Sequence, residues 1–179
     1  MSNQIKPLLM KHYGISPWEI NVITSILDKR FQTEDEEIEN TYEEKFVSHL
    51  EVSFPYSFND EFFKWFDFKE WDRLKGVFKE MKRRRGDGKA LRIELNFSGD
   101  PDIKFVMQSD QSQWFKMEVE KIDFVVELLP YHLDEEKLPK NVKSVIYYFD
   151  QEAARWRLGE VFTNEKKFVS SGKGWKLTT

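Results

Sequence analysis

Apolar residues recur at helical spacing near the start of the chain. Ser16 has the side chain of a helix N-cap, Pro17 suits the first helical position, and Glu19 completes a capping box. The apolar stripe that follows consists of Ile20, Ile23, Ile26 or Leu27, and Phe31. Together with a short helix expected over residues 5–13, this pattern predicts a helical N-terminal segment over residues 1–33.

A second helical pattern extends over residues 59–85, with a break expected near Asp67. Asp67 and Glu70 are the residue types of a capping box, and Gly86 stands where such a helix would end. One face of the part after the break is apolar and carries Trp71, Leu74, Phe78 and Met81. This pattern predicts a long amphipathic helix in the middle of the chain.

Elsewhere the apolar residues recur at every second position, which is typical of strands. Residues 90–97 and 103–107 show this alternation on either side of the turn sequence SGDPD. Residues 46–54 also predict a strand. Near the C-terminus, VKSVIYYF, ARWRLGEVFT and KKFVSSGKGWKLT predict three or more antiparallel strands joined by turns.

Residues 114–129 fit two templates. The strand template is matched, with a bulge, by Phe115, Met117, Val119, Ile122, Phe124, Val126 and Leu128. The helical template is matched by Phe115, Val119, Ile122, Val126 and Leu129. The β-branched and aromatic content favours a strand.

The whole pattern predicts an α+β fold. A helical N-terminal segment (1–33) and an acidic linker (34–45) are expected to precede an α+β domain (46–179), with all three compact as one unit. In the domain, a curved and mainly antiparallel sheet of about six or seven strands is expected to pack on one long helix.

Composition narrows the chemistry. The chain of 179 residues has no cysteine, which excludes disulfides, thiolate nucleophiles and cysteine-ligated zinc. The three histidines show no metal-ligand spacing, and we expect no metal site and no cofactor, although carboxylates alone could still hold Mg²⁺ or Ca²⁺. No apolar run approaches 18 residues, so we expect no membrane span and a cytoplasmic protein.

Charge is unevenly spread along the chain. Residues 34–44 hold seven acids and no lysine or arginine. Removing these seven from the 32 acids of the chain leaves 25 acids against 28 Lys and Arg, a net charge of +3. The acidic total therefore conceals a mildly basic body joined to an acidic strip.

Residues 54–68 are unusually aromatic, with eight rings in 15 positions. One side of so short a segment cannot easily bury all eight rings, and aromatic residues dominate interface hot spots. We therefore expect a non-enzymatic binding or regulatory protein that contacts a protein partner or a small apolar ligand. The expected contact residues are Phe62, Phe63, Trp65 and Phe66.

A basic run offers a first alternative, which is nucleic-acid binding. Lys82, Arg83, Arg84 and Arg85 are adjacent at the end of the predicted long helix and could neutralise phosphates. Cations also gather at helix ends because they offset the negative end of the helix dipole. Nucleic-acid-binding modules are usually strongly basic and this domain is not, which favours the structural interpretation.

A metal-dependent nuclease is a second alternative. Pro101-Asp102 precedes a predicted strand, and Glu118, Glu120 and Lys121 follow on the next element, which supplies the residue types of PD-(D/E)xK nucleases. The sequence EVEK, however, places Lys121 directly after Glu120. On a regular strand these two side chains would point to opposite faces.

Overall fold

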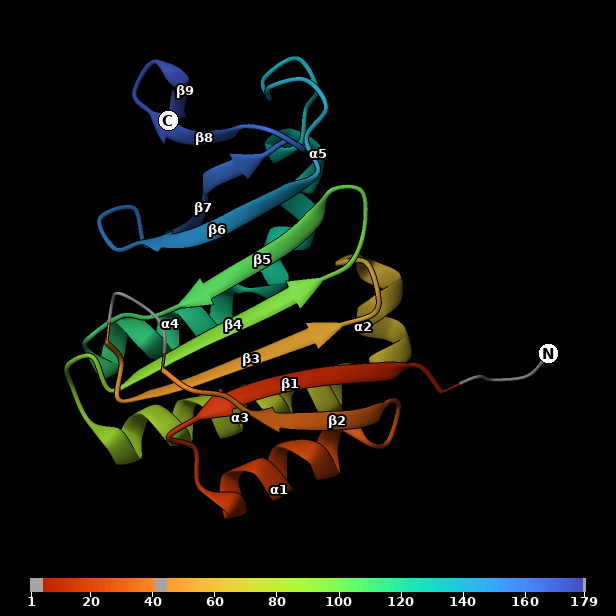
Figure 1. Cartoon of the computed structure of the whole chain (residues 1–179), viewed down its shortest axis with the longest axis vertical. Helices are drawn as coiled ribbons and strands as arrows, with labels where there is room; N and C mark the ends of the chain where they lie inside the picture. Colours follow the sequence, from red (N-terminus) through yellow and green to blue (C-terminus); the bar gives the residue numbers. More distant parts are fainter. Residues whose placement is uncertain (1–4, 41–44, 179) are drawn as a thin grey trace.

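A computed structural model describes residues 5–40 and 45–178 of the chain. Its centre is one mixed sheet of nine strands in the order β2-β1-β3-β4-β5-β6-β7-β8-β9 (Figure 1). The strands are β1 (Pro7–Tyr13), β2 (Gln32–Glu37), β3 (Ser48–Phe54), β4 (Leu91–Phe97), β5 (Asp102–Met107), β6 (Ser144–Asp150), β7 (Arg155–Phe162), β8 (Lys167–Ser171) and β9 (Gly174–Thr178). The helices are α1 (Pro17–Leu27), α2 (Asp60–Phe66), α3 (Phe68–Arg85), α4 (Ser112–Lys121), the 3-10 helix η1 (Asp123–Leu128) and α5 (Leu129–His132).

Helical crossovers build most of the sheet. Strands β1 and β2 are parallel and joined through α1, β3 and β4 through α2 and α3, and β5 and β6 through α4, η1 and α5. These three units meet along antiparallel pairs, and β7 to β9 then continue as an antiparallel meander. Parallel neighbours need such crossovers because a tight turn can join only antiparallel strands.

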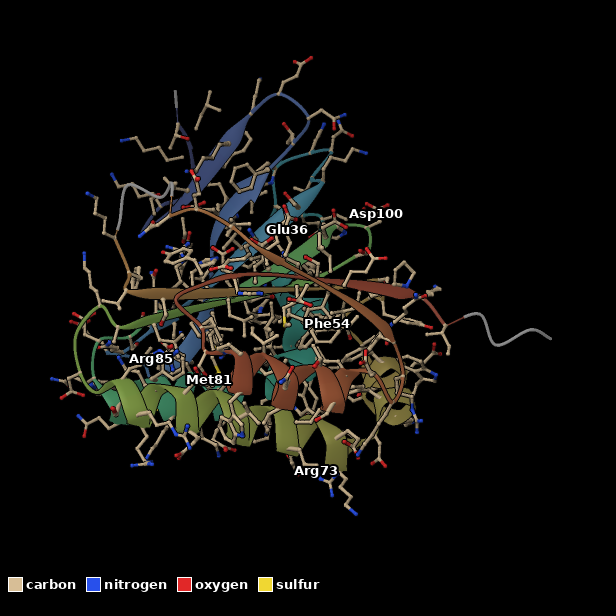
Figure 2. The ribbon with its side chains drawn as sticks, turned by 60° about the horizontal axis from the view of Figure 1, so that its bottom comes forward. Glu36, Phe54, Arg73, Met81, Arg85 and Asp100 are labelled. Atoms are coloured by element: carbon tan, nitrogen blue, oxygen red, sulfur yellow. The ribbon has the colours of Figure 1, made fainter. Side chains whose placement is uncertain are left out.

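Helices α1, α3 and α4 form one layer behind the sheet, and no helix of the described ranges covers the other face (Figure 1). The alternation along β4 explains why helices cover only one face of the sheet. The apolar side chains point into the core and the polar ones between them point to the other face; the apolar ones are Leu91, Ile93, Leu95 and Phe97. In Figure 2 the helices lie below the sheet, and the side chain of Arg73 points away from the core. The hydrophobic core therefore lies between one sheet face and one helix layer.

The long central helix follows its sequence pattern. It begins after a break at Asp67, whose carboxylate accepts a hydrogen bond from the backbone N–H of Lys69 at 3.1 Å, and ends at Gly86. The capping box predicted for Asp67 and Glu70 does not form, because the Glu70 carboxylate pairs with Lys29, whereas the one predicted at Ser16 and Glu19 is present at the start of α1. Gly14, just before it, has φ of +66°, and an added Cβ would lie 2.4 Å from the carbonyl oxygen of Val47.

The N-terminal prediction is wrong in part. Residues 5–13, expected as a short helix, contain strand β1, in which Leu8 and Met10 are buried and their neighbours are more exposed. This alternation is a strand pattern that the short apolar run concealed. The predicted helical segment 1–33 therefore contributes a strand to the main sheet.

The acidic strip, expected as a linker over residues 34–45, is also partly a strand. Residues 32–37 form β2, which pairs in parallel with β1 from Pro7↔Gln32 to His12↔Glu37. An edge strand uses only one side of its backbone for pairing, so its charged side chains remain in water. Residues 41–44 lie outside the described part of the chain.

Residues 114–129 are helical, contrary to the predicted strand. Phe115, Val119 and Ile122 lie on the buried side of α4 and its end, as the helical template requires. Their spacing of three to four residues fits one face of a helix, and this burial outweighs the β-propensity of the residues.

The sheet is also larger than expected, with nine strands in place of six or seven. Its single long helix is joined in one layer by α1 and α4, of 11 and 10 residues. Five of the eight neighbouring strand pairs are antiparallel, so the mainly antiparallel character holds only narrowly. None of the helices described here is long and apolar enough to span a membrane.

Candidate functional site

Most of the aromatic segment lies in the core. Phe62, Phe63 and Phe66 of α2 are at most 2 % exposed, and the ring of Phe62 meets that of Phe97 edge to face at 5.3 Å between centroids. Trp65, the fourth predicted contact residue, is 38 % exposed. Phe62, Phe63 and Phe66 are therefore core residues and cannot contact a partner in this fold.

The interior holds more rings of this segment than its length suggests, because distant elements leave room for them. Phe31, at the end of α1, packs against Trp65 at 5.2 Å, and Phe105 of β5 packs against Phe58 at 4.8 Å. Besides Trp65, Phe68 reaches the surface with 52 % exposure. The segment is thus a corner where helix and sheet meet, with two rings at its surface.

The basic run is divided by the structure. Lys82 is fully buried, and its ammonium donates a hydrogen bond to the carbonyl oxygen of Gly88 at 3.1 Å. The guanidinium of Arg85 donates two hydrogen bonds to the carboxylate of Glu19, at 2.7 and 2.9 Å. Lys82 and Arg85 therefore hold the fold together and are not displayed as a basic surface.

The other two arginines of the run are exposed and share one acid. Arg83 and Arg84 both donate hydrogen bonds to the carboxylate of Glu80. Hydrogen bonds from Arg83 and then Arg84 lower the pKa of Glu80 to about 2. Positions 82–85 thus present two partly neutralised cations in place of four aligned ones.

The residues of the nuclease alternative do not converge. Asp102 begins β5, whereas Glu118 contacts Ser109 beyond the other end of that strand, roughly 20 Å away at about 3.3 Å per residue. Glu120 pairs with lysines of α3, and the ammonium of Lys121 donates to the carbonyl oxygen of Ala154 at 2.6 Å. The four side chains therefore do not form a single metal site.

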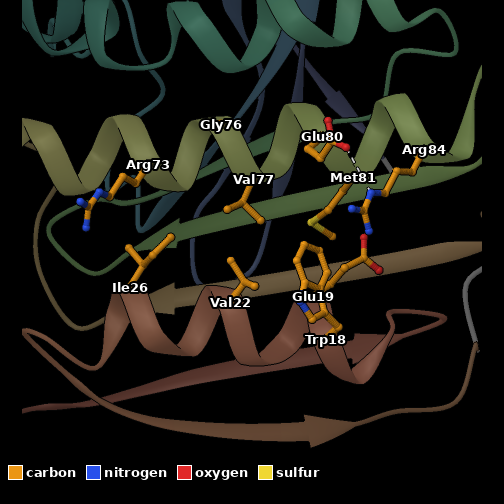
Figure 3. A pocket seen from close by; sticks show the side chains of 10 residues that line it. All are labelled: Trp18, Glu19, Val22, Ile26, Arg73, Gly76, Val77, Glu80, Met81 and Arg84. Atoms are coloured by element: carbon orange, nitrogen blue, oxygen red, sulfur yellow. Dashed lines mark hydrogen bonds and ion pairs between the residues drawn. The ribbon is translucent and has the colours of Figure 1, made fainter.

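The structure shows an apolar groove on the outer side of the helix layer, between α1 and α3 (Figure 3). Trp18, Val22 and Ile26 are four residues apart on α1 and line one wall. Val77 and Met81, also four apart, line the facing wall on α3. The groove has a volume of about 350 Å³ and is open to solvent.

Its ends are marked by cations. Arg73 lies at one end and Arg84 at the other (Figure 3). The guanidinium of Arg84 lies 4.6 Å from the ring centroid of Trp18, whose side chain is 56 % exposed. A cation over an indole face is a favourable arrangement that also holds the ring in place.

A buried ion pair fixes the distance between the two helices at one end. The carboxylate of Glu19, in the first turn of α1, is nearly inaccessible and meets Arg85 in the last turn of α3. Although burial raises the pKa of Glu19, hydrogen bonds from Arg85 and Ser16 outweigh it, so that the pKa is lowered. Glu19 is therefore ionised at neutral pH, and its bond to Arg85 holds the groove walls in register.

Gly76, in the middle of α3, is an exposed lining residue of the groove, and the open space left by its missing side chain is called the hollow below. A Cβ added at Gly76 would have no atom within 4 Å, so nothing in the described chain requires a glycine there. Glycine in a helix interior costs about 0.5–1 kcal/mol relative to alanine. An unfilled hollow at an unfavourable residue suits the close approach of something outside the chain.

Gly76→Ala is therefore expected to stabilise the free protein by about 0.5–1 kcal/mol, because alanine gains helix propensity without a clash. Chemical denaturation of both proteins measures this change. A loss of stability would mean that packing within the chain requires the glycine, and the hollow would then have an internal cause.

Sequence reasoning missed this groove although its signal is present. The stripe of α1 that was identified faces the core and includes Ile26, which also lines the groove, whereas Trp18 and Val22 extend the apolar surface beside it. The apolar stripe of α1 is wider than the face that the core buries, and this excess width is the sequence signal for a second apolar surface. Its alignment with α3 could not be predicted, because it depends on how two helices distant in sequence pack together.

A second cluster lies on the sheet face that no helix of the described ranges covers. Ligand atoms of His49, Glu51 and Glu94 are all within 4.8 Å of one another and could approach a metal ion. Burial lowers the pKa of His49 to about 4, so its ring is neutral at pH 7. Glu94, however, already pairs with Arg92 at 2.8 Å and Lys104 at 3.3 Å, and a metal ion would compete with both cations.

No protein-family model, curated protein or solved structure matches this chain. What the chain does must therefore be inferred from its own surface.

Proposed function

We propose that this is a non-enzymatic binding protein whose contact surface is the groove between α1 and α3. The observation that carries the proposal is a groove open to solvent, where Trp18 is exposed, Val22 and Val77 are half-buried, and the space beside Gly76 is open. Two parallel rows of apolar side chains with a gap between them suit an amphipathic helix laid along the groove. The occupant is thus a helical segment of a partner protein.

Charges at the groove favour an acidic partner segment. Once the Glu19–Arg85 pair is set aside, the lining contains Arg73, Arg84 and one acid, Glu80. Both arginines are partly neutralised, Arg84 by Glu80 at 3.1 Å and Arg73 by Glu70 at 3.5 Å, and a partner carboxylate would add to these exposed pairs. On a helix rising 1.5 Å per residue, the two arginines are about 16 Å apart, or three turns. A partner helix with apolar residues at its centre and Glu or Asp near both ends would complement this spacing.

Gly76→Gln is the sharpest test, because it fills the hollow with a helix-compatible side chain. Affinity capture from the native host is expected to retain a partner on the unmodified chain and to lose it, by at least tenfold, on Gly76→Gln. Lys69→Gln is the matched control: it is exposed on the same helix but lies outside the groove, so it should retain the partner.

If Gly76→Gln and Lys69→Gln capture equal amounts of the partner, the partner binds elsewhere and the groove is not the contact surface. Mass spectrometry of the purified chain covers the case of a small apolar ligand. If an apolar molecule is bound and Gly76→Gln displaces it, the groove is a binding site, but its occupant is a small ligand and not a helix of a partner protein.

A further inference from the structure

A second site lies at the carboxyl ends of β5 and β6, away from the groove. These neighbouring parallel strands end beside a cleft of about 450 Å³. Gln108, Ser109 and Gln111 line it from the loop after β5, and Gln151 lines it from the turn after β6. In open sheets the carboxyl ends of parallel strands are where ligands commonly bind.

Glu118 of α4 closes the inner end of this cleft. The residue is 2 % exposed, and one carboxylate oxygen accepts a hydrogen bond from the hydroxyl of Ser109. Gln151 donates to the same hydroxyl at 3.2 Å. These contacts connect the crossover helix to the ends of both strands.

The second oxygen of Glu118, Oε2, is buried, and no donor of the described residues meets strict hydrogen-bond geometry with it, although the backbone N–H groups of Ser109 and Gln108 lie near the carboxyl. A buried acceptor without a donor costs about 1–3 kcal/mol, so native structures seldom leave one unused. The cleft therefore contains a buried acceptor that a ligand can satisfy.

The surroundings of the carboxyl are close to neutral overall. Burial raises the pKa of Glu118, hydrogen bonds from Ser109 and Gln108 oppose this rise, and the charge of the buried Lys82 of α3 opposes it further. At the cleft, Lys89 and Asp110 carry opposite charges. A strongly charged ligand would find no net counter-charge here.

The remaining lining favours hydroxyl groups. Each of the three glutamine amides can both donate and accept a hydrogen bond, as a hydroxyl can. The half-buried ring of Phe149 adds an apolar surface against which the C–H face of a ligand can pack. The volume falls within the usual range of small-molecule sites.

We propose that this cleft binds a small uncharged polyhydroxylated molecule, in the class of sugars and polyols. One ligand hydroxyl forms a hydrogen bond with Oε2 of Glu118, as donor or acceptor according to whether the carboxyl is ionised or protonated, and others exchange hydrogen bonds with Gln111 and Gln151. The site is independent of the groove and of the proposed protein partner.

The test uses the full chain and a panel of glucose, maltose and glycerol, with glucosamine and gluconate as charged analogues. Saturation-transfer NMR is expected to show binding of at least one neutral compound. The double variant Gln111→Ala/Gln151→Ala should weaken that binding at least tenfold. Both side chains are exposed, so the fold should be retained.

Gln32→Ala, an exposed glutamine of β2 distant in sequence from the cleft, is the matched control and should bind as the unmodified chain does. Gly76→Gln should also leave binding unchanged, which separates this site from the groove. The proposal is overturned if no neutral compound binds, if only a charged analogue binds, or if the double variant binds as tightly as the control. The first of these results would mean that only water satisfies Glu118.

Discussion

Phe66→Ala is expected to lower the free energy of unfolding by about 3–5 kcal/mol, the usual cost of truncating a fully buried phenylalanine. The ring of Phe66 is inaccessible, stacks on that of Phe62 at 5.6 Å, and packs near Phe54 and Phe31. Its removal leaves a cavity that these rings cannot easily close. Urea denaturation followed by circular dichroism measures the change.

Phe68→Ala is the matched comparison two residues away. That ring is half-exposed, so its loss should cost about 1 kcal/mol or less. Similar losses for the two variants would contradict the assignment of Phe66 to the core and would restore the aromatic segment as a contact surface.

Glu118→Gln is expected to stabilise the protein by about 3 kcal/mol at pH 8 and to have little effect near pH 4. Burial raises the pKa of Glu118 from 4.5 to about 7, so the folded state retains a proton that the unfolded state has lost. The stability of the unmodified protein therefore falls as pH rises from 4.5 to 7, at about 1.4 kcal/mol per pH unit. Glutamine has nearly the same shape and does not titrate, which removes this loss.

The measurement is the difference in unfolding free energy between variant and parent from pH 4 to pH 8. Taking the difference cancels the other titrating groups, including His49 and Glu94. Glu120→Gln is the control on the same helix. The pKa of Glu120 is lowered, chiefly by its hydrogen bond from Lys79, so its replacement should act in the opposite direction and weakly. If the difference in unfolding free energy between Glu118→Gln and the parent is the same from pH 4 to pH 8, burial does not raise the pKa of Glu118.

Local patterns were sufficient for the elements whose stabilisation is local. The capping box of α1, the break at Asp67 and the alternation of β4 were all predicted from residue type and spacing, because each depends on neighbours within a few positions. Residues 114–129 matched two periods at once. Only their packing against α3 and the sheet selects the helix.

Strand β2, in contrast, could not be predicted from local sequence. Six polar or charged residues in succession do not resemble a strand, and their order comes from backbone pairing with β1, 25 positions earlier. The candidate sites are non-local in the same way. Trp18 and Gly76 face one groove, and Ser109 and Glu118 meet Gln151, only because the fold brings distant segments together.

The proposed binding of a partner helix in the groove between α1 and α3 can be measured by backbone amide NMR of the full chain, titrated with a 16-residue amphipathic helical peptide that carries Glu at both ends. We expect shifts concentrated in residues 18–26 and 73–84, and weaker binding when the terminal Glu residues are replaced by Lys. Shifts centred on Trp65 and Phe68, or equal binding of the two peptides, would contradict this proposal.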